Sequence, residues 1–181
     1  MTARVALTYR DYVALPDDGK RYEIHDGALS VTPSPTSDHQ IVSIRLSTFL
    51  HRHVEARGLG IVLAAPLDVI LADTTILQPD IVYLDRERLP RLRRRGVEGA
   101  PTLVVEIVSP TTANADRGTK RQLYARHAIP YFWLVDPATR VLEALVLRRG
   151  AYEVALSARG SEPIDVPPFA DLRLDPSSLW P

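Results

Sequence analysis

Short apolar runs separated by turn-forming residues dominate the chain and predict a β-sheet. Three of these runs are continuously apolar or nearly so, at Asp80–Leu84, Thr102–Val108 and Tyr131–Val135. Runs of this length and composition are typical of strands that are buried on both faces. Thr102–Val108 is rich in β-branched residues, so we expect it near the centre of the sheet.

Two hairpins are predicted, one on either side of these central strands. In the N-terminal hairpin, two strands flank Asp26-Gly27, a common two-residue turn. In the C-terminal hairpin, two strands flank Arg149-Gly150. A further strand-rich stretch is interrupted by Pro66. The predicted ranges are Arg21–Ile24 and Ala28–Thr32, then Gly60–Leu71, then Val141–Leu147 and Tyr152–Ser157.

Helical spacing replaces strand-like alternation at three places. Thr8–Leu15 predicts a short helix, Ser37–Arg57 a long one that ends at Gly58, and Asp116–His127 a third. Strands alternating with helices predict an α/β sheet that carries helices on its faces. The expected apolar stripe of the long helix is Ile41, Ile44, Leu46, Phe49, Leu50 and Val54.

Composition narrows the classes of protein. The 181 residues, 45% of them hydrophobic and 24% charged, favour one globular domain over residues 1–181. No apolar run approaches the roughly 18 residues of a membrane span, and the N-terminus lacks the apolar core of a signal peptide. Zero cysteines exclude disulfides and thiolate-bound zinc and fit a cytoplasmic protein. Because the net charge is zero, nucleic-acid binding would need a local basic face.

Two strand-like runs each carry one acid, Asp80 in the first and Glu106 in the second. Buried carboxylates are costly unless they are paired, so acids on core strands indicate a site. Adjacent strands lie about 4.8 Å apart, which would let both acids share one ion. Mg²⁺ prefers such hard oxygen ligands, and a bound metal would activate a water for phosphodiester hydrolysis. Lys120 could then stabilise developing negative charge.

The predicted third helix carries a line of polar residues. Asp116, Lys120 and Tyr124 are spaced four apart, so they project from one helical face. They would follow Glu106 through a strand–loop–helix connection. The alternative is a surface ion pair, worth only about 0.3–0.5 kcal/mol.

Several motifs together resemble one family. They are R-Y-E-I-H-D-G-A-L, P-S-P-T-x-x-H-Q-I, P-D-I-V-Y-L, V-V-E-I-V-S-P, D-x-x-x-K-x-x-x-Y and P-Y-F-W-L-V-D-P. This combination, from about Tyr9 to Leu156, is similar to the Uma-type endonuclease family, which was long carried as a domain of unknown function. That family belongs to the PD-(D/E)XK nuclease superfamily. The resemblance implies a restriction-endonuclease-like fold, with a mixed central sheet flanked by helices and a site that uses Mg²⁺ or Mn²⁺.

The resemblance also implies roles for individual residues. Asp80 and Glu106 match the two acids of the superfamily pattern, and Glu23 fits an early acid that can join the metal shell. Val108 departs from the pattern, because the superfamily has a lysine two residues after the second acid. Related nucleases can supply the lysine from the following helix, which makes Lys120 the substitute.

Other polar residues have two interpretations each. Glu23 is either a metal ligand or a solvated hairpin residue, and His39 is either a capping or packing residue or a group that faces the phosphate. Asp68 and Gln78 are further candidates. Four arginines of the charged connector Asp85–Gly99 either contact phosphate or belong to a flexible solvated loop. These are Arg91, Arg93, Arg94 and Arg95.

The function hypothesis is a metal-dependent endonuclease that hydrolyses phosphodiester bonds in DNA. The alternative is a catalytically inactive nucleic-acid-binding or assembly module on the same scaffold, which the valine at position 108 favours. A glycosidase that uses the two acids ranks behind both, because no aromatic residues line a sugar site. Nucleases of the resembling kind often pair to cut both strands, so a homodimer is compatible with the resemblance, although no motif in the chain indicates one. Neither the substrate form nor sequence specificity follows from the residues.

Overall fold

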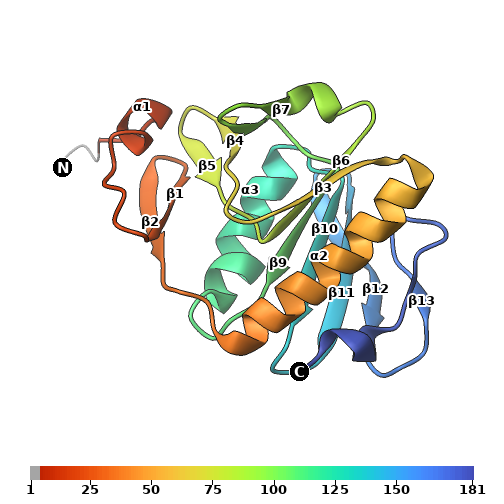
Figure 1. Ribbon diagram of the computed structural model, residues 1–181. Helices are drawn as coiled ribbons and strands as arrows, with labels where there is room; N and C mark the ends of the chain where they lie inside the picture. Colours follow the sequence, from red (N-terminus) through yellow and green to blue (C-terminus); the bar gives the residue numbers. More distant parts are fainter. Residues whose placement is uncertain (1–4) are drawn as a thin grey trace.

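The computed structural model describes residues 5–181 and contains two six-stranded mixed sheets with helices packed against them (Figure 1). The fold class expected from the sequence is confirmed. The larger sheet has the strand order β12-β11-β10-β9-β6-β3, and all its neighbours are antiparallel except β9 and β10. Its strands are β3 (Gly60–Ala64), β6 (Ile81–Asp85), β9 (Leu103–Ile107), β10 (Tyr131–Asp136), β11 (Val141–Arg148) and β12 (Ala151–Ala158).

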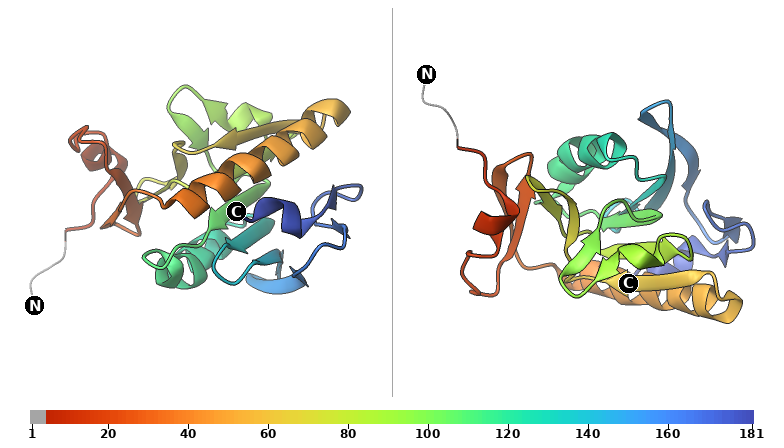
Figure 2. Two further views of the ribbon diagram at one scale, coloured as in Figure 1. Left: turned by 60° about the horizontal axis from the view of Figure 1, so that its bottom comes forward. Right: turned by 90° about the horizontal axis from the view of Figure 1, so that it is seen from above.

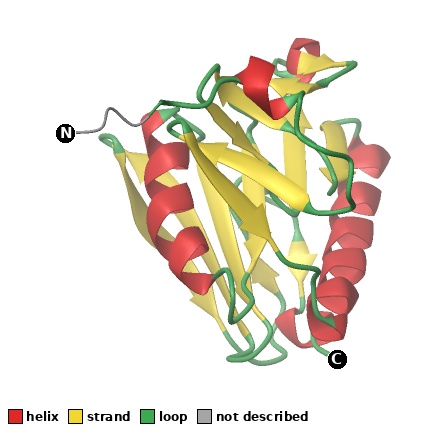
Figure 3. Cartoon of the chain, turned by 90° about the vertical axis from the view of Figure 1, so that its left-hand side faces the viewer, coloured by secondary structure: helices red, strands yellow, loops and turns green. Residues whose placement is uncertain are grey.

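Strand β9 lies inside this sheet, as its β-branched composition predicts, and its side chains alternate between two cores. Leu103, Val105 and Ile107 pack with helix α2 (Ser37–Arg57), whereas Val104 and Val108 pack on the opposite face with helix α3 (Arg121–Arg126). Figures 2 and 3 show the two helices on opposite sides of the strands. Because Glu106 shares the parity of Val104 and Val108, it faces α3.

The second sheet has the order β2-β1-β5-β4-β8-β7 and forms from strands far apart in the chain. The predicted N-terminal hairpin is present, with Asp26 and Gly27 both at positive φ in its turn. A Cβ on Gly27 would lie 2.6 Å from the Cβ of Ala6, so only glycine fits there. The elements are α1 (Tyr9–Tyr12), β1 (Arg21–His25), β2 (Ala28–Thr32), β4 (Val69–Ala72), β5 (Thr75–Leu77), β7 (Leu92–Arg93) and β8 (Gly96–Glu98).

The structure corrects three sequence predictions. Ile44 is 65% exposed and is not part of the buried stripe of α2, which includes Val42 instead. The connector Asp85–Gly99 is not simply a loop, because it contains β7, β8 and a 3-10 turn at Leu89–Arg91. The predicted third helix begins as a π-helix over Ala115–Lys120 and continues as α3. Single π turns within helices often mark functional sites.

The C-terminal segment returns across the α2 side of the larger sheet. Trp133 donates a hydrogen bond from Nε1 to the Pro167 carbonyl at 2.7 Å, and Phe169 and Trp180 join the same core. This segment contains β13 (Ile164–Asp165), β14 (Arg173–Leu174) and a 3-10 turn at Pro176–Leu179. No helix within residues 5–181 has both the length and the apolar character to cross a membrane.

Candidate active site

Strand register brings the two predicted acids together. Strands β6 and β9 are antiparallel with Ile81 opposite Val105, so one further step places Asp80 opposite Glu106. Residues directly opposite in an antiparallel pair present their side chains on the same face. Asp80 directly precedes β6, where the chain passes from the smaller sheet into the larger one.

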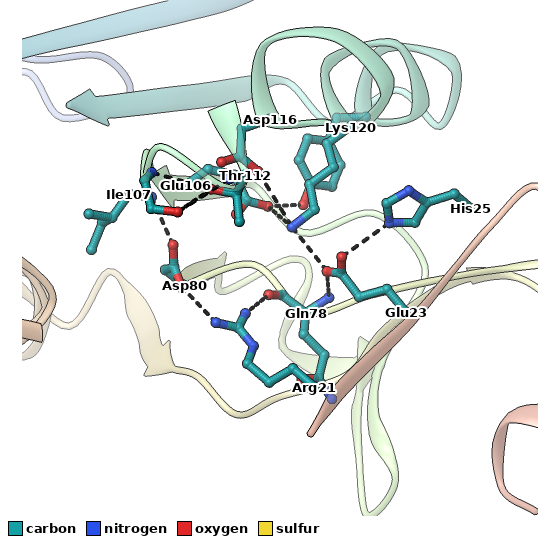
Figure 4. Close-up of polar contacts among 12 residues, drawn as sticks. Arg21, Glu23, His25, Gln78, Asp80, Glu106, Ile107, Thr112, Asp116 and Lys120 are labelled. Atoms are coloured by element: carbon teal, nitrogen blue, oxygen red, sulfur yellow. Dashed lines mark hydrogen bonds and ion pairs between the residues drawn. The ribbon is translucent and has the colours of Figure 1, made fainter. Parts of the chain in front are cut away.

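Asp80 is buried and accepts hydrogen bonds at both oxygens (Figure 4). Its Oδ2 lies 3.1 Å from His39 Nε2 and accepts from the Ile107 amide at 2.8 Å, while its Oδ1 accepts from Arg21 at 3.2 Å. Burial alone would raise the pKa of Asp80, but His39, Arg21 and the amide together hold it below its usual value. Asp80 is therefore an anion at neutral pH.

Glu106, the second of the two predicted acids, pairs with Lys120. Lys120 Nζ lies 3.1 Å from Glu106 Oε1, which also accepts a hydrogen bond from the Tyr124 hydroxyl. The Lys120 ammonium is also 3.7 Å from Asp116 Oδ1, and that oxygen has no hydrogen-bond partner among the described residues. The structure thus places Lys120 and Tyr124 against Glu106 and Asp116 against Lys120, so the three residues share one face as their helical spacing predicts.

Glu23 reaches the same ammonium from the smaller sheet. Its Oε1 lies 3.0 Å from Lys120 Nζ and accepts the Gln78 amide at 2.7 Å, and its Oε2 lies 3.1 Å from His25 Nε2. The side chain is only 1% exposed, so the solvated-hairpin interpretation of Glu23 is wrong. Lys120 therefore joins an acid of each sheet.

The three acids around the Lys120 ammonium differ in the direction of their pKa shifts. Burial would raise the pKa of Glu23, but Lys120 and hydrogen bonds from His25 and Gln78 lower it to about 2. Burial raises the pKa of Glu106 well above its usual value, because the charge of Lys120 does not offset burial and the neighbouring acids. The pKa of Asp116 is raised by the same balance. Burial alone would lower the pKa of Lys120, but the negative charges of the three acids outweigh this effect and raise it. Lys120 therefore stays protonated and cannot act as a general base at neutral pH.

Asp80, Glu106 and Lys120 line one narrow pocket of about 30 Å³, which is large enough to admit water. The pocket adjoins a wider groove of about 790 Å³. The two share Arg21 and the segment 32–35, so this segment and Arg21 form the boundary between them. Other residues lining the narrow pocket are Thr36, His39, Ile107, Ser109, Thr111, Thr112 and Asp116.

The donor atoms of the pocket suit a hard cation. Mg²⁺ is commonly held by one or two carboxylates, with water and substrate completing its shell. Asp80 and Glu106 supply such oxygens, and Asp116 Oδ1 is a buried carboxylate oxygen that a cation would satisfy. Within residues 5–181, no three His, Asp or Glu side chains gather closely enough to hold an ion alone. A cation shared by Asp80 and Glu106 therefore stays a prediction that requires water or substrate ligands.

The four connector arginines lie away from the acid pocket. Arg91 donates to the Ala100 carbonyl, and Arg95 pairs with Glu98 at 2.6 Å and stacks over the Tyr9 ring. Arg94 and Arg95 line a separate hollow that shares Gln78 with the wider groove, and Arg93 is exposed. None of the four lines the narrow pocket.

Arg21 is the main residue of the site that the sequence interpretation missed. It begins strand β1 and reaches Asp80, while the Glu23 side chain two residues later reaches Lys120. Because side chains two apart on a strand share a face, singling out Glu23 could have led to Arg21. Thr111 and Thr112 carried no such signal, since their place in the pocket depends on the loop after β9.

Comparison with known proteins identifies the family. The sequence profile of Uma2, described as "Putative restriction endonuclease", matches residues 9–177. The chain therefore belongs to the Uma2 family. This finding confirms the resemblance seen in the sequence motifs.

Two individual proteins are similar to this Uma2 chain. An uncharacterised protein of Synechocystis sp. is 30% identical over 124 residues, covering 67% of this chain and 63% of its own length. The crystal structure of a protein from Anabaena variabilis, described as "a putative nuclease belonging to DUF820", superposes with a TM-score of 0.78. That match covers 96% of this chain and 97% of the other at 21% identity, and it shows that the fold is shared.

Proposed function

We propose that this protein is a metal-dependent endonuclease that hydrolyses phosphodiester bonds in DNA, with Mg²⁺ or Mn²⁺ as its cofactor. The observation that carries the proposal is the convergence of Asp80, Glu106 and Lys120 in one pocket beside a groove. The family description supports a nuclease. The divalent ion and the DNA substrate are part of the proposal.

Each residue has a definite task in this mechanism. Asp80 and Glu106 would hold the ion, which when bound polarises the scissile phosphate and acidifies a water. Lys120 is permanently charged, so it stabilises negative charge that develops on the phosphate rather than taking a proton. Glu23 holds Lys120 in place, and its own entry into the metal shell would require it to exchange the Gln78 and Lys120 contacts.

The position of Lys120 compensates for the valine at position 108. Val108 is buried among the side chains that α3 packs against, so a lysine could not extend from there without disrupting that core. The helix instead brings an ammonium to within 3.1 Å of Glu106. This contact favours an active enzyme over the catalytically inactive binding or assembly module.

Cleavage of supercoiled plasmid tests the proposal. We expect nicking with Mg²⁺ or Mn²⁺, none in EDTA, and a loss of at least about a hundredfold in Asp80→Asn. Asp85→Asn is the matched control, since Asp85 lies at the other end of the same strand and caps a turn through the Arg88 amide. Unchanged cleavage by Asp80→Asn would refute the mechanism. DNA binding that persists in EDTA, with no nicking under any condition, would instead select the inactive module.

A further inference from the structure

Arg21 sits at the boundary between the acid pocket and the groove. Its side chain is 21% exposed, and it lines both hollows. Of its two terminal nitrogens, Nη1 donates to Asp80 Oδ1 at 3.2 Å and Nη2 donates to the Gln78 carbonyl. The mechanism proposed above gives this residue no task.

The pairing of Arg21 with Asp80 is incomplete. A guanidinium and a carboxylate can form two parallel hydrogen bonds, yet here only one links them, because His39 and the Ile107 amide already occupy Asp80 Oδ2. Arg21 Nε is buried and has no hydrogen-bond partner among residues 5–181. Arg21 thus keeps one buried donor unused, which is costly, while the side chain as a whole remains 21% exposed beside the groove.

Asp80 Oδ1 is the oxygen at which Arg21 and a metal ion would compete. Of the two Asp80 oxygens, it is the one not already held by two donors. A divalent cation on this oxygen would repel the guanidinium 3.2 Å away. Arg21 must then find another anion, and its position opens onto the groove.

We propose that Arg21 is a phosphate-binding residue whose availability depends on the metal. Without metal, Arg21 neutralises Asp80. Once a cation occupies Asp80, the guanidinium turns to the groove and binds a phosphate of the substrate strand next to the one being cleaved. Arginine suits this task because its fork of donors matches phosphate oxygens. The inference rests on the proposed function and identifies the residue that couples metal binding to substrate binding.

Binding of a short fluorescent DNA duplex tests this coupling, with Ca²⁺ used in place of Mg²⁺ to avoid turnover. We expect Arg21→Met to weaken binding about tenfold in Ca²⁺ and to lower the slope of log affinity against log salt by about one. In EDTA the variant and the wild-type protein should bind alike, since Arg21 is then tied to Asp80. Arg21→Lys keeps the charge and should restore most of the slope.

Lys20→Met is the matched control, because Lys20 also lines the groove but is 59% exposed and pairs with Asp18 rather than Asp80. Its effect on DNA affinity should be the same in Ca²⁺ and EDTA. Thermal unfolding with increasing Ca²⁺ gives a readout independent of DNA, and Arg21→Met should reach half its shift at a several-fold lower Ca²⁺ concentration.

The outcomes separate this inference from the proposed function. An equal loss of DNA affinity in Ca²⁺ and EDTA, or no loss in Ca²⁺, would overturn the role of Arg21 and leave the cleavage results on Asp80→Asn unaffected. If Ca²⁺ fails to raise the unfolding temperature of the wild-type protein, the metal site itself is refuted, and the coupling falls with it.

Discussion

Replacing Lys120 by methionine should destabilise the protein strongly and in a pH-dependent way. The ammonium is 5% exposed and lies within 4 Å of three buried acids, Glu23, Glu106 and Asp116. Methionine preserves much of the side-chain volume but removes the charge. The variant must therefore bury carboxylates with no cation or protonate them.

The pKa of Glu23 gives the size of the effect. Its lowering from 4.5 to about 2 corresponds to about 3 kcal/mol at neutral pH. Breaking a buried ion pair by removing one partner costs about 3–5 kcal/mol, in agreement. A lowered folded-state pKa contributes stability above the unfolded-state value of 4.5, and this contribution is lost as the pH falls towards 2. By the same relation, about 1 kcal/mol of the stabilisation from Glu23 ionisation remains at pH 3.

Urea unfolding followed by tryptophan fluorescence measures this difference, since Trp133 and Trp180 are both buried. We expect Lys120→Met to lower the free energy of unfolding by about 3 kcal/mol at pH 7 and by about 1 kcal/mol at pH 3. Lys20→Met makes the same chemical change at an exposed pair and should leave the free energy of unfolding nearly unchanged.

Two results would refute this reasoning. One is a Lys120→Met protein as stable at pH 7 as the Lys20→Met control. The other is a large loss of equal size at pH 7 and pH 3, which would show that packing rather than charge accounts for the destabilisation.

Two further predictions concern Glu106 in strand β9 and Val108, which directly follows that strand. Glu106→Gln should raise the free energy of unfolding at pH 7, because burial and neighbouring acids raise the pKa of Glu106 so that its ionisation opposes folding, while Lys120 keeps Glu23 as its partner. A lower free energy of unfolding, measured in urea, would contradict this. Val108→Lys should destabilise by about 3 kcal/mol or more, since the ammonium would enter the core formed with Leu123 and Phe132. Its plasmid cleavage, measured at a temperature where it remains folded, should not exceed that of the wild-type protein.

The parts of the fold that depend on local pattern could be predicted from the sequence. Thr102–Val108 marks the inner strand β9. The four-residue spacing of Asp116, Lys120 and Tyr124 places them on one face, where Lys120 and Tyr124 contact Glu106 and Asp116 contacts Lys120. In each case a single periodicity determines which face is buried.

The smaller sheet could not be predicted in the same way, because it depends on non-local pairing. Strand β5 has only three residues, too few to show a period, and β1 meets it through a single register pair, Ile24 opposite Ile76. The prediction that Ile44 is buried was wrong for a different reason. Its apolar character suggested a place in the buried stripe, but the orientation of α2 turns this side chain towards solvent. The strand spacing from Glu23 could have pointed to Arg21, but no local pattern identifies Asp80, 59 positions away, as its partner.

Lys120 binds one acid from each sheet, Glu23 from the smaller and Glu106 from the larger. The ammonium that is proposed to stabilise the reacting phosphate thus also links the two sheets. A gene copy that lost this lysine would therefore encode a much less stable protein as well as one without the proposed phosphate-stabilising group. Cells would then remove such proteins by proteolysis rather than accumulate them in a folded, inactive form.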